Sequence, residues 1–587
     1  MRKTPETNKA ASKAESKTIA DQPNNDQPAL VRNSSRPKQA WKAALIAVGA
    51  AAFAAEIPFF FFGTPSGHDV EFHLYSWLEV LAQWKQGIVF PRWAAMAHFA
   101  YGEPRFIFYP PASWLLGALL SAVFPWGIAS SVYIWIVLTL AGMSMFVLAR
   151  RWFDPRDAIF AAVLYAVNPY HLVIVYWRSA FAELLASCLL PLLLWLVLKA
   201  VDGERRVILP LSLVMAAAWL TNAPAAVMIH YSFALLLVVF AWQKRSARPL
   251  LMGAAAVAIG ACLAAFYLLP AIYEQKWVNI AEAISQGSRP IDNFLFIHTT
   301  DADHDAFNRV ISWVAILEIV VTLGMAWATR KWAAHKWLAA KGRVWNALFL
   351  WAVACSVLMF PFTALLWRFL PKLEFMQFPW RWMLCLSIVF TIFVAAGARR
   401  WWGRIAVYVI ALVVIVTLWL RVLPPWWDNA GDLKEMRDNM TDGIGYEGVD
   451  EYTPVGADPA AIDKDARKVT VDGDMHGPDM HSSIHVLLWN AESKRFTAEM
   501  SAPGQLVLRL FRYPAWKVEV NGYVVRTAEK PGTGQMLIPV EAGMNRVQIT
   551  FARTWDRTAG GWISVVTAIL LILWSFQLTS GRRSSPE

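Results

Sequence analysis

Charged residues are scarce in this sequence, and so are cysteines. Asp, Glu, Lys and Arg make up 17% of its 587 residues, whereas soluble globular chains carry about 25%. Hydrophobic residues reach 57% and the mean hydropathy is +0.39, which excludes an ordinary soluble protein and favours a membrane protein. The four cysteines lie far apart inside apolar runs, so a disulfide framework and a cysteine-based zinc site are both excluded.

Common catalytic and nucleotide-binding motifs are also absent. The sequence has no GxGxxG, P-loop, HExxH or nucleophile elbow. Its formal net charge of +11 does not indicate nucleic-acid binding, because the basic residues stand in short clusters between apolar runs, as in the cytoplasmic loops of membrane proteins. No nucleic acid is therefore expected among its partners.

Apolar runs dominate the chain, and a membrane-spanning helix needs about 20 such residues. A shorter apolar helix, 112–125, follows Pro110-Pro111, so the sequence predicts 12 to 14 transmembrane helices. The predicted fold class is a polytopic α-helical membrane protein. The candidate spans are 42–62, 128–149, 158–176, 181–201, 207–222, 225–242, 250–272, 309–329, 346–362, 381–397, 405–423 and 559–577.

Basic clusters between these runs predict the orientation in the membrane. If 112–125 does not cross, every cluster lies on the side of the basic N-terminal tail, which the positive-inside rule makes cytoplasmic. If it crosses, either the cluster at Arg150 moves outside or another helix must be re-entrant. We expect a multi-pass protein of the inner (plasma) membrane, with a disordered cytoplasmic tail at 1–40 and another cytoplasmic tail at 578–587. The loops expected outside are 63–110, 273–308, 363–380 and 424–558.

Residues 424–558 differ from the rest of the chain, because charge is frequent there and long apolar runs are missing. Apolar residues alternate at Leu506, Leu508 and Leu510, a period typical of a half-buried strand. Asn521-Gly522 between two such segments is a strong hairpin signal. The pattern predicts an extracytoplasmic loop and β-sandwich between a bundle at 41–423 and a final transmembrane helix at 559–577.

The first outer loop brings acids and imidazoles together at the predicted membrane surface. Asp69, Glu71 and His73 follow the first span, and Asp69 and His73 share a face if the segment is helical. A carboxylate at such a boundary can act as a general base. The alternative is a solvated helix start in which Asp69 is a cap or a first-turn anion.

Further charged residues stand where other spans meet the predicted outer surface. Arg178 and Glu183 separate two spans, Glu274 ends another, and Arg381 begins a fourth. Arginine there suits a phosphate group, but an Arg178–Glu183 pair that closes a turn and interface snorkelling by Arg381 are the alternatives. The acidic loop Asp301–Asp305 can hold a divalent cation or simply be solvated.

Several of these segments together resemble a known bacterial membrane-protein family, one named for a relation to 6-pyruvoyl-tetrahydropterin synthase and akin to YfhO-like proteins. The resemblance spans roughly 42–577 and is specific as a set. It is carried by Gly67–His73, Phe90–Trp93, Tyr101–Pro104, Phe108–Pro111, Tyr176–Glu183, Phe266–Glu274, Gln377–Arg381, Tyr513–Gly522 and Glu541–Asn545.

Both groups resemble the GT-C superfamily of membrane glycosyltransferases. The resemblance implies transfer of a sugar from a polyprenyl-phosphate donor, at the bilayer, to an extracytoplasmic glycan, lipid or protein. It implies Asp69 as catalytic base, with Glu71 as competitor. The Gly-His-Asp pattern lacks the paired acids of many GT-C members, so no metal ligand is assigned. The 11 histidines show no cluster of the kind that pterin synthesis needs.

The mechanism expected from this resemblance gives each remaining residue a role. Arg178 and Arg381 would stabilise the leaving phosphate, while His73, Glu183 and Glu274 would orient groups or bind sugar hydroxyls. No cofactor is required, and a divalent cation stays open. A transporter or lipid-handling protein, or an envelope-assembly scaffold, is the alternative from another class, since intramembrane charges also serve transport paths.

Overall fold

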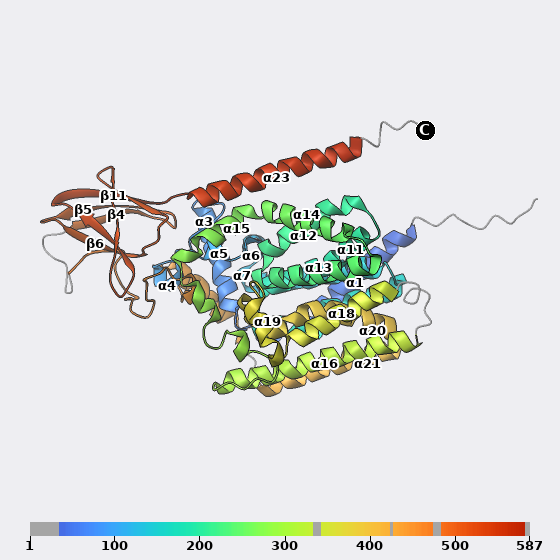
Figure 1. Cartoon of the computed structure of the whole chain (residues 1–587). Coiled ribbons are helices and arrows are strands. Elements are labelled where there is room, and N and C mark those ends of the chain that lie inside the picture. Colours follow the sequence, from blue (N-terminus) through green and yellow to red (C-terminus); the bar gives the residue numbers. More distant parts are fainter. Residues whose placement is uncertain (1–34, 333–341, 399, 423–425, 474–482, 581–587) are drawn as a thin grey trace, which may run out of the picture. The chain divides into compact units, whose positions relative to one another are not determined.

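The computed structural model describes all residues except 1–34, 333–341, 399, 423–425, 474–482 and 581–587. Most of the predicted tails 1–40 and 578–587 therefore lies outside the described residues. The chain divides into two units, Met1–Lys42 and Ala43–Glu587, and the description below concerns the second. Helices dominate this unit up to residue 441, and antiparallel strands follow (Figure 1).

The helices of the structure have the following bounds. The first half contains α1 (Ser35–Ala55), α2 (Phe59–Phe62), α3 (Val70–Lys85), α4 (Ala97–Ala100), α5 (Arg105–Phe108), α6 (Pro111–Val123), α7 (Trp126–Ala149), α8 (Pro155–Ala166), α9 (Pro169–Val173), the π-helical turn η1 (Ile174–Arg178), α10 (Phe181–Ser187), α11 (Leu189–Val201), α12 (Ile208–Thr221), α13 (Ala223–Lys244) and α14 (Arg248–Leu263). The second half contains α15 (Ala265–Glu274), α16 (Ala302–Trp332), α18 (Gly342–Leu358), α19 (Ala364–Phe369), α20 (Met383–Gly397), α21 (Trp401–Val422), α22 (Ala430–Thr441) and α23 (Trp555–Ser580).

Eight helical segments of the described residues are long and apolar enough to cross a membrane, or up to ten if each of two bent pairs is one span. The predicted fold class, a polytopic helical membrane protein with a C-terminal β region, is confirmed, but the eight to ten candidate spans among the described residues are fewer than the 12 to 14 predicted. Two of the predicted runs, 112–125 and 207–222, form the shorter apolar helices α6 and α12. Thirteen or fourteen helical residues rise only about 20 Å, which is less than the hydrocarbon core.

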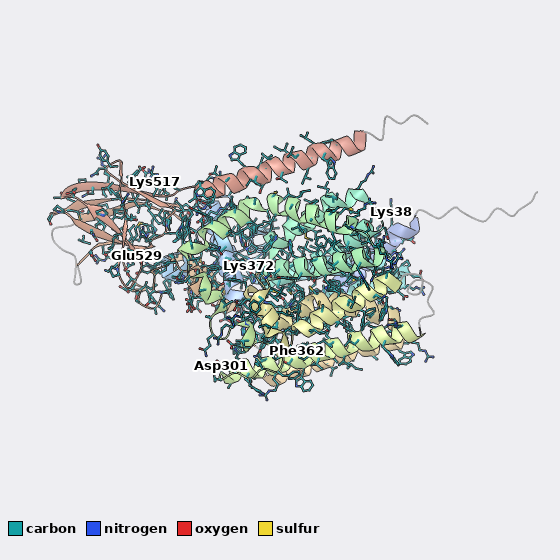
Figure 2. All side chains as sticks on the ribbon, in the orientation of Figure 1. Lys38, Asp301, Phe362, Lys372, Lys517 and Glu529 are labelled. Atoms are coloured by element: carbon teal, nitrogen blue, oxygen red, sulfur yellow. The ribbon has the colours of Figure 1, made fainter. Side chains whose placement is uncertain are left out.

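The two bent pairs interrupt candidate spans at defined points. Helices α14 and α15 meet at 76°, and the segment Pro361–Phe369 leaves α18 at 94°. Pro361 explains the second bend, because a residue before proline is pushed out of the helical region and Phe360 is extended there. Phe362, just past this bend, is exposed (Figure 2).

The C-terminal strands form two antiparallel sheets that share one hydrophobic core, with Leu508 and Ile538 from one sheet against Phe496, Val518 and Ile549 from the other. Their strand orders are β3-β6-β10-β9 and β4-β5-β11-β7-β8. The strands are β3 (Val469–Val471), β4 (Ser483–Trp489), β5 (Ser493–Met500), β6 (Gly504–Phe511), β7 (Trp516–Val520), β8 (Tyr523–Val524), β9 (Ala528–Glu529), β10 (Gln535–Val540) and β11 (Gly543–Phe551).

The turn at Asn521-Gly522 joins β7 to β8 as an antiparallel pair. Both residues have positive φ, 52° and 87°, which is the requirement of a type I′ turn and the reason for the Asn-Gly preference. Alternate residues of β7 are buried and Lys517 is exposed. The period of two in the sequence therefore corresponds to the alternation of buried and more exposed side chains along this strand.

A short two-stranded antiparallel ladder connects the predicted first outer loop, 63–110, to the chain after α21. Strand β1 (Thr64–Pro65) pairs with β2 (Trp427–Asp428), more than 360 residues later. The loop that carries the candidate base is therefore tied at its start to the segment that leads into the β region. The Thr64 hydroxyl also lies 2.9 Å from the Ser130 hydroxyl of α7.

A buried ion cluster fixes the end of the same loop. The Glu103 carboxylate contacts Arg105 Nε at 2.5 Å and His98 Nε2 at 2.9 Å, and it accepts the Val449 N–H at 2.9 Å. Burial by itself would raise the pKa of Glu103, but the charges of Arg105 and His98 outweigh it and hold the pKa at about 2, below its usual 4.5.

We expect this cluster to make stability depend on acid pH. Because the folded pKa of Glu103 is depressed, its contribution is fully present above pH 4.5 and is lost as the pH falls towards 2. The shift corresponds to a free energy on the order of 3 kcal/mol. Melting temperatures of the wild type and Glu103→Gln should differ most at pH 6 and converge towards pH 3. A gap that stays constant over this range would contradict the assignment.

Candidate functional site

The loop between α2 and α3, which carries Gly67 and Asp69, packs against the turn that follows η1. The Asp69 N–H donates to the Arg178 carbonyl at 2.9 Å, and the Gly67 N–H donates to the Ser179 hydroxyl at 3.0 Å. A Cβ added at Gly67 would lie 2.6 Å from backbone atoms of Arg178 and Ser179, so only glycine permits this approach. Two segments more than 100 residues apart are thus held as one unit.

Asp69 stands at the N-cap position of α3, but its side chain makes no capping hydrogen bond. Its Oδ2 instead lies 3.4 Å from Nη2 of Arg178, and the side chain is 38% exposed. The capping alternative for Asp69 therefore does not describe this carboxylate. Asp69 is the member of the site that reaches solvent while it contacts a buried cation.

Glu183 joins the two arginines named from the sequence. Its Oε2 lies 2.5 Å from Arg178 Nη1 and 3.2 Å from Arg381 Nε, and its Oε1 accepts the Tyr170 hydroxyl at 2.5 Å. All four side chains are buried. The structure therefore brings Asp69, Arg178, Glu183 and Arg381 into one continuous chain of ion pairs, and Tyr170 is a member that sequence analysis missed.

Aromatic rings and carbonyl groups hold the two guanidinium groups in place. The Arg178 guanidinium lies 5.1 Å from the ring centre of Trp380, and that of Arg381 lies 4.7 Å from Phe378. Arg381 Nη1 also donates to the Met376 carbonyl at 2.7 Å. Snorkelling does not describe Arg381, because its side chain is buried. Such stacking suits arginine better than lysine.

Buried ion pairs like these contribute little net stability, because removing charges from water costs about as much as their attraction returns. The carboxylates of Asp69 and Glu183 neutralise the two guanidinium groups. This charge balance is kept only while Asp69 stays in contact with Arg178. An arriving anion can displace Asp69 from Arg178 and keep the charges balanced. The arrangement can therefore exchange an exposed carboxylate for a bound anion.

His73 lies one helical turn after Asp69, as the predicted helix requires, and its backbone N–H donates to the Asp69 carbonyl at 3.1 Å. Burial lowers the pKa of His73 to about 4, so the imidazole is neutral at physiological pH. The ring stacks on Phe181 at 5.1 Å. Among the described residues, neither ring nitrogen has a hydrogen-bond partner, which is unusual for a buried polar group.

Glu71, the competitor for the role of base, is exposed on α3. Its carboxylate joins none of the ion pairs that connect Asp69, Arg178, Glu183 and Arg381. The structure thus distinguishes the two acids by environment. One contacts a buried cation, and the other faces solvent.

Glu274 belongs to a separate cluster. Its two carboxylate oxygens accept Nε and Nη2 of Arg557, each at 2.7 Å, and the Tyr513 hydroxyl at 2.6 Å. The Thr554 hydroxyl lies 3.4 Å away. The side chain is fully buried, so we leave Glu274 out of the candidate site and assign it to the joint between α15, the β region and α23.

The acidic loop Asp301–Asp305 uses its carboxylates locally. Asp301 accepts the backbone N–H groups of Asp303 and His304 at 2.9 Å, at the start of α16 (Figure 2). Asp305 pairs with Arg309 at 2.6 Å. Within the described ranges, no group of three or more His, Cys, Asp and Glu side chains is placed to hold a metal ion.

Comparison with known proteins supports one relationship. The family described as "6-pyruvoyl-tetrahydropterin synthase related domain; membrane protein" matches residues 106–426, and no curated protein matches the chain. The match covers more than half of the chain and includes Arg178, Glu183 and Arg381, but not Asp69. The family predicted from sequence is thereby confirmed. The chain belongs to the 6-pyruvoyl-tetrahydropterin synthase-related family of membrane proteins.

Proposed function

We propose that the chain is a GT-C-like membrane glycosyltransferase that transfers a sugar from a polyprenyl-phosphate donor to an extracytoplasmic acceptor. The observation that carries the proposal is the contact between the partly exposed Asp69 carboxylate and buried Arg178, itself linked through Glu183 to Arg381. A base beside a pair of cations is the arrangement that an acceptor hydroxyl and a leaving phosphate require together.

The proposed reaction is a single displacement. Asp69 takes the proton of the acceptor hydroxyl, whose oxygen attacks the anomeric carbon of the sugar. The bond between that carbon and the phosphate oxygen breaks, and its electron pair leaves with the polyprenyl phosphate. Arg178 and Arg381 stabilise the charge that grows on the phosphate. As phosphate engages Arg178, Asp69 is released to act as base.

The remaining residues of the site have supporting roles in this proposal. Neutral His73, one helical turn after the base, has two unpartnered ring nitrogens that would bind sugar hydroxyls. Glu183 and Tyr170 hold the two guanidinium groups at a fixed spacing. The proposal puts this loop outside the cytoplasm and both termini inside, in the inner (plasma) membrane, because the positive-inside rule assigns the basic clusters of the sequence to cytoplasmic loops.

One observation favours a second function, a transporter or lipid-handling protein without chemistry. Glu318 of α16 is buried in a candidate span, where its Oε1 accepts the Ser387 hydroxyl at 2.8 Å. Ser387 lies 3.2 Å from the Asn168 amide oxygen, and Glu318 Oε2 has no partner among the described residues. Acidic residues at membrane depth often mark transport paths.

The test is an assay of the purified full-length chain in lipid vesicles with a radiolabelled polyprenyl-phosphate sugar and an envelope acceptor fraction. If the chain is a glycosyltransferase, the labelled sugar should move to the acceptor and polyprenyl phosphate should be released. A deletion strain should accumulate the lipid-linked sugar. If label never leaves the lipid with any donor of this class, and the strain accumulates none, the proposed enzyme is rejected.

Glu318→Gln separates the two functions. The glutamine keeps the shape of the side chain and can still accept from Ser387, so the fold should persist. We expect sugar transfer by this variant to continue, because no ion pair links Glu318 to Asp69 or to Arg178 among the described residues. If Glu318→Gln instead stops the movement of a lipid or solute across the membrane while its melting temperature is unchanged, the second function is supported.

A further inference from the structure

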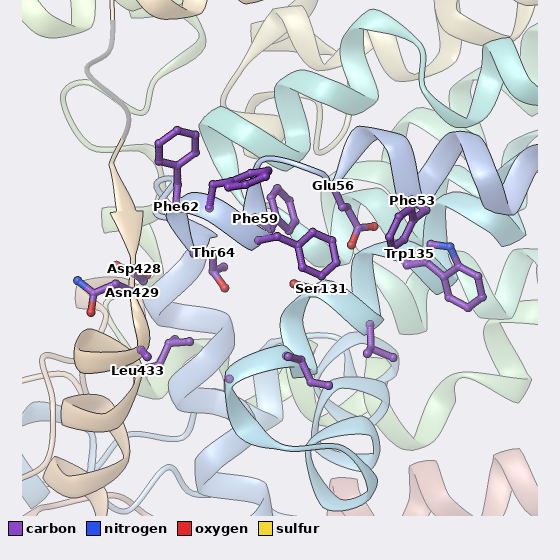
Figure 3. Close-up of a pocket in the computed structure, with 17 residues that line it drawn as sticks. Phe53, Glu56, Phe59, Phe62, Thr64, Ser131, Trp135, Asp428, Asn429 and Leu433 are labelled. Carbon is purple, nitrogen blue, oxygen red and sulfur yellow. The ribbon is translucent and has the colours of Figure 1, made fainter.

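A cavity of about 540 Å³ lies at the end of α1, away from the chain of ion pairs at Asp69. Its walls come from the last turn of α1, from α2, from the first turns of α7 and from the start of α22, and the paired strands β1 and β2 adjoin it. Figure 3 shows Glu56 among the rings of Phe53 and Phe59, with Asp428 and Asn429 across the cavity. Its volume is that of a small-molecule site.

Each acid in this wall has one carboxyl oxygen without a hydrogen-bond partner among the described residues. Glu56 is only 4% exposed, and its Oε1 has no hydrogen-bond partner among the residues that the structure describes. The Oδ2 atom of Asp428 is also buried without a described partner. Leaving buried acceptors unpaired costs free energy, so a ligand with hydrogen-bond donors would be stabilised here.

The rest of the wall includes five phenylalanines and Trp135, and it carries no cation. None of the 17 lining residues is lysine or arginine. Phe60, Phe61 and Phe62 are 55 to 76% exposed at the end of a candidate membrane span, where an acyl chain can cover them. An anionic headgroup would meet two acidic side chains and no cation, whereas an ammonium group suits both the acids and the rings.

We propose that this cavity binds a membrane lipid with a primary ammonium headgroup. The ammonium donates to Glu56 and Asp428, the rings of Phe53 and Phe59 surround it, and the acyl chains lie along the exposed phenylalanines. The hydroxyl of Ser131 and the amide of Asn429 also line the cavity, where they can contact the lipid phosphate. This site does not depend on the glycosyl transfer proposed above.

Native mass spectrometry of the delipidated full-length chain tests the proposal with three lipids of identical acyl chains. Phosphatidylethanolamine carries N–H donors, phosphatidylcholine has the positive charge without donors, and phosphatidylglycerol is anionic. We expect the ethanolamine lipid to bind about tenfold more tightly than either of the others, the effect of one charge-assisted hydrogen bond. Equal binding of all three lipids by the wild type overturns the proposal.

Variants test whether the preference for the ethanolamine lipid arises at this cavity. Glu56→Gln and Asp428→Asn should each reduce it, whereas Glu435→Gln, which changes an exposed acid of α22, should not. Gly127→Leu fills the cavity, and a Cβ at Gly127 meets no atom within 4 Å, so the melting temperature should be retained while the ethanolamine lipid is excluded. An undiminished preference in folded Gly127→Leu places the lipid elsewhere and refutes this site.

Discussion

Asp69→Asn should lower the rate of sugar transfer by about 10²- to 10⁴-fold, the usual contribution of a positioned general base. Asparagine fills the same space and keeps an oxygen for Arg178 Nη2, which lies 3.4 Å from the carboxylate. It cannot accept the proton of the acceptor hydroxyl. We therefore expect kcat to fall while the donor still binds and the melting temperature changes little.

The matched control is Glu71→Gln, because Glu71 stands two residues away on the same helix, exposed and outside the ion pairs. Transfer by this variant should stay close to that of the wild type. If Glu71→Gln abolishes transfer and Asp69→Asn does not, the base is Glu71. If both variants transfer sugar at the wild-type rate, neither acid is the base.

The sequence was sufficient to predict the fold class and one turn of the β region. Apolar runs identified helices because a span needs about 20 consecutive apolar residues, and Asn521-Gly522 predicted its turn because both positions require positive φ. The length of an apolar run does not show where a helix bends or ends early. The bend before Pro361 and the short helix α12 became visible only in the structure.

The sequence identified residues of the candidate site but not how they are arranged in space. Asp69, Arg178, Glu183 and Arg381 could each be named, since charges beside apolar runs are conspicuous. Their connection through Glu183 could not, because ion pairs across more than 100 residues leave no periodic signal in one sequence. Tyr170 lies inside an apolar run, where a tyrosine more often serves packing, so nothing indicated its bond to Glu183.

Glu274 is the opposite case, a conspicuous charge whose partners suggest a structural role. Its acid ends a predicted span, which resembles a binding position, but Arg557 and Tyr513 occupy both oxygens. Arg557 lies 283 residues away, at the start of α23. Only the folded chain brings the two together.

The joint at Glu274 leads to the largest stability effect that we expect. Arg557→Met should destabilise the protein by about 3–5 kcal/mol, because it leaves the fully buried Glu274 carboxylate without its counter-charge. The measurement is the midpoint of thermal or denaturant unfolding of the full-length chain in detergent. Arg546→Met removes an exposed arginine of β11 and should change stability by less than about 0.5 kcal/mol.

A double variant distinguishes an unpaired charge from lost packing. Glu274→Gln with Arg557→Met removes both charges, and the amide can still accept from Tyr513, so much of the loss should be recovered. Breaking one partner of a buried pair costs far more than replacing both by neutral groups. If the double variant is as unstable as the sum of the single variants, the ion pair is not what secures α15 to α23, and the apolar contacts around Tyr513 carry that joint instead.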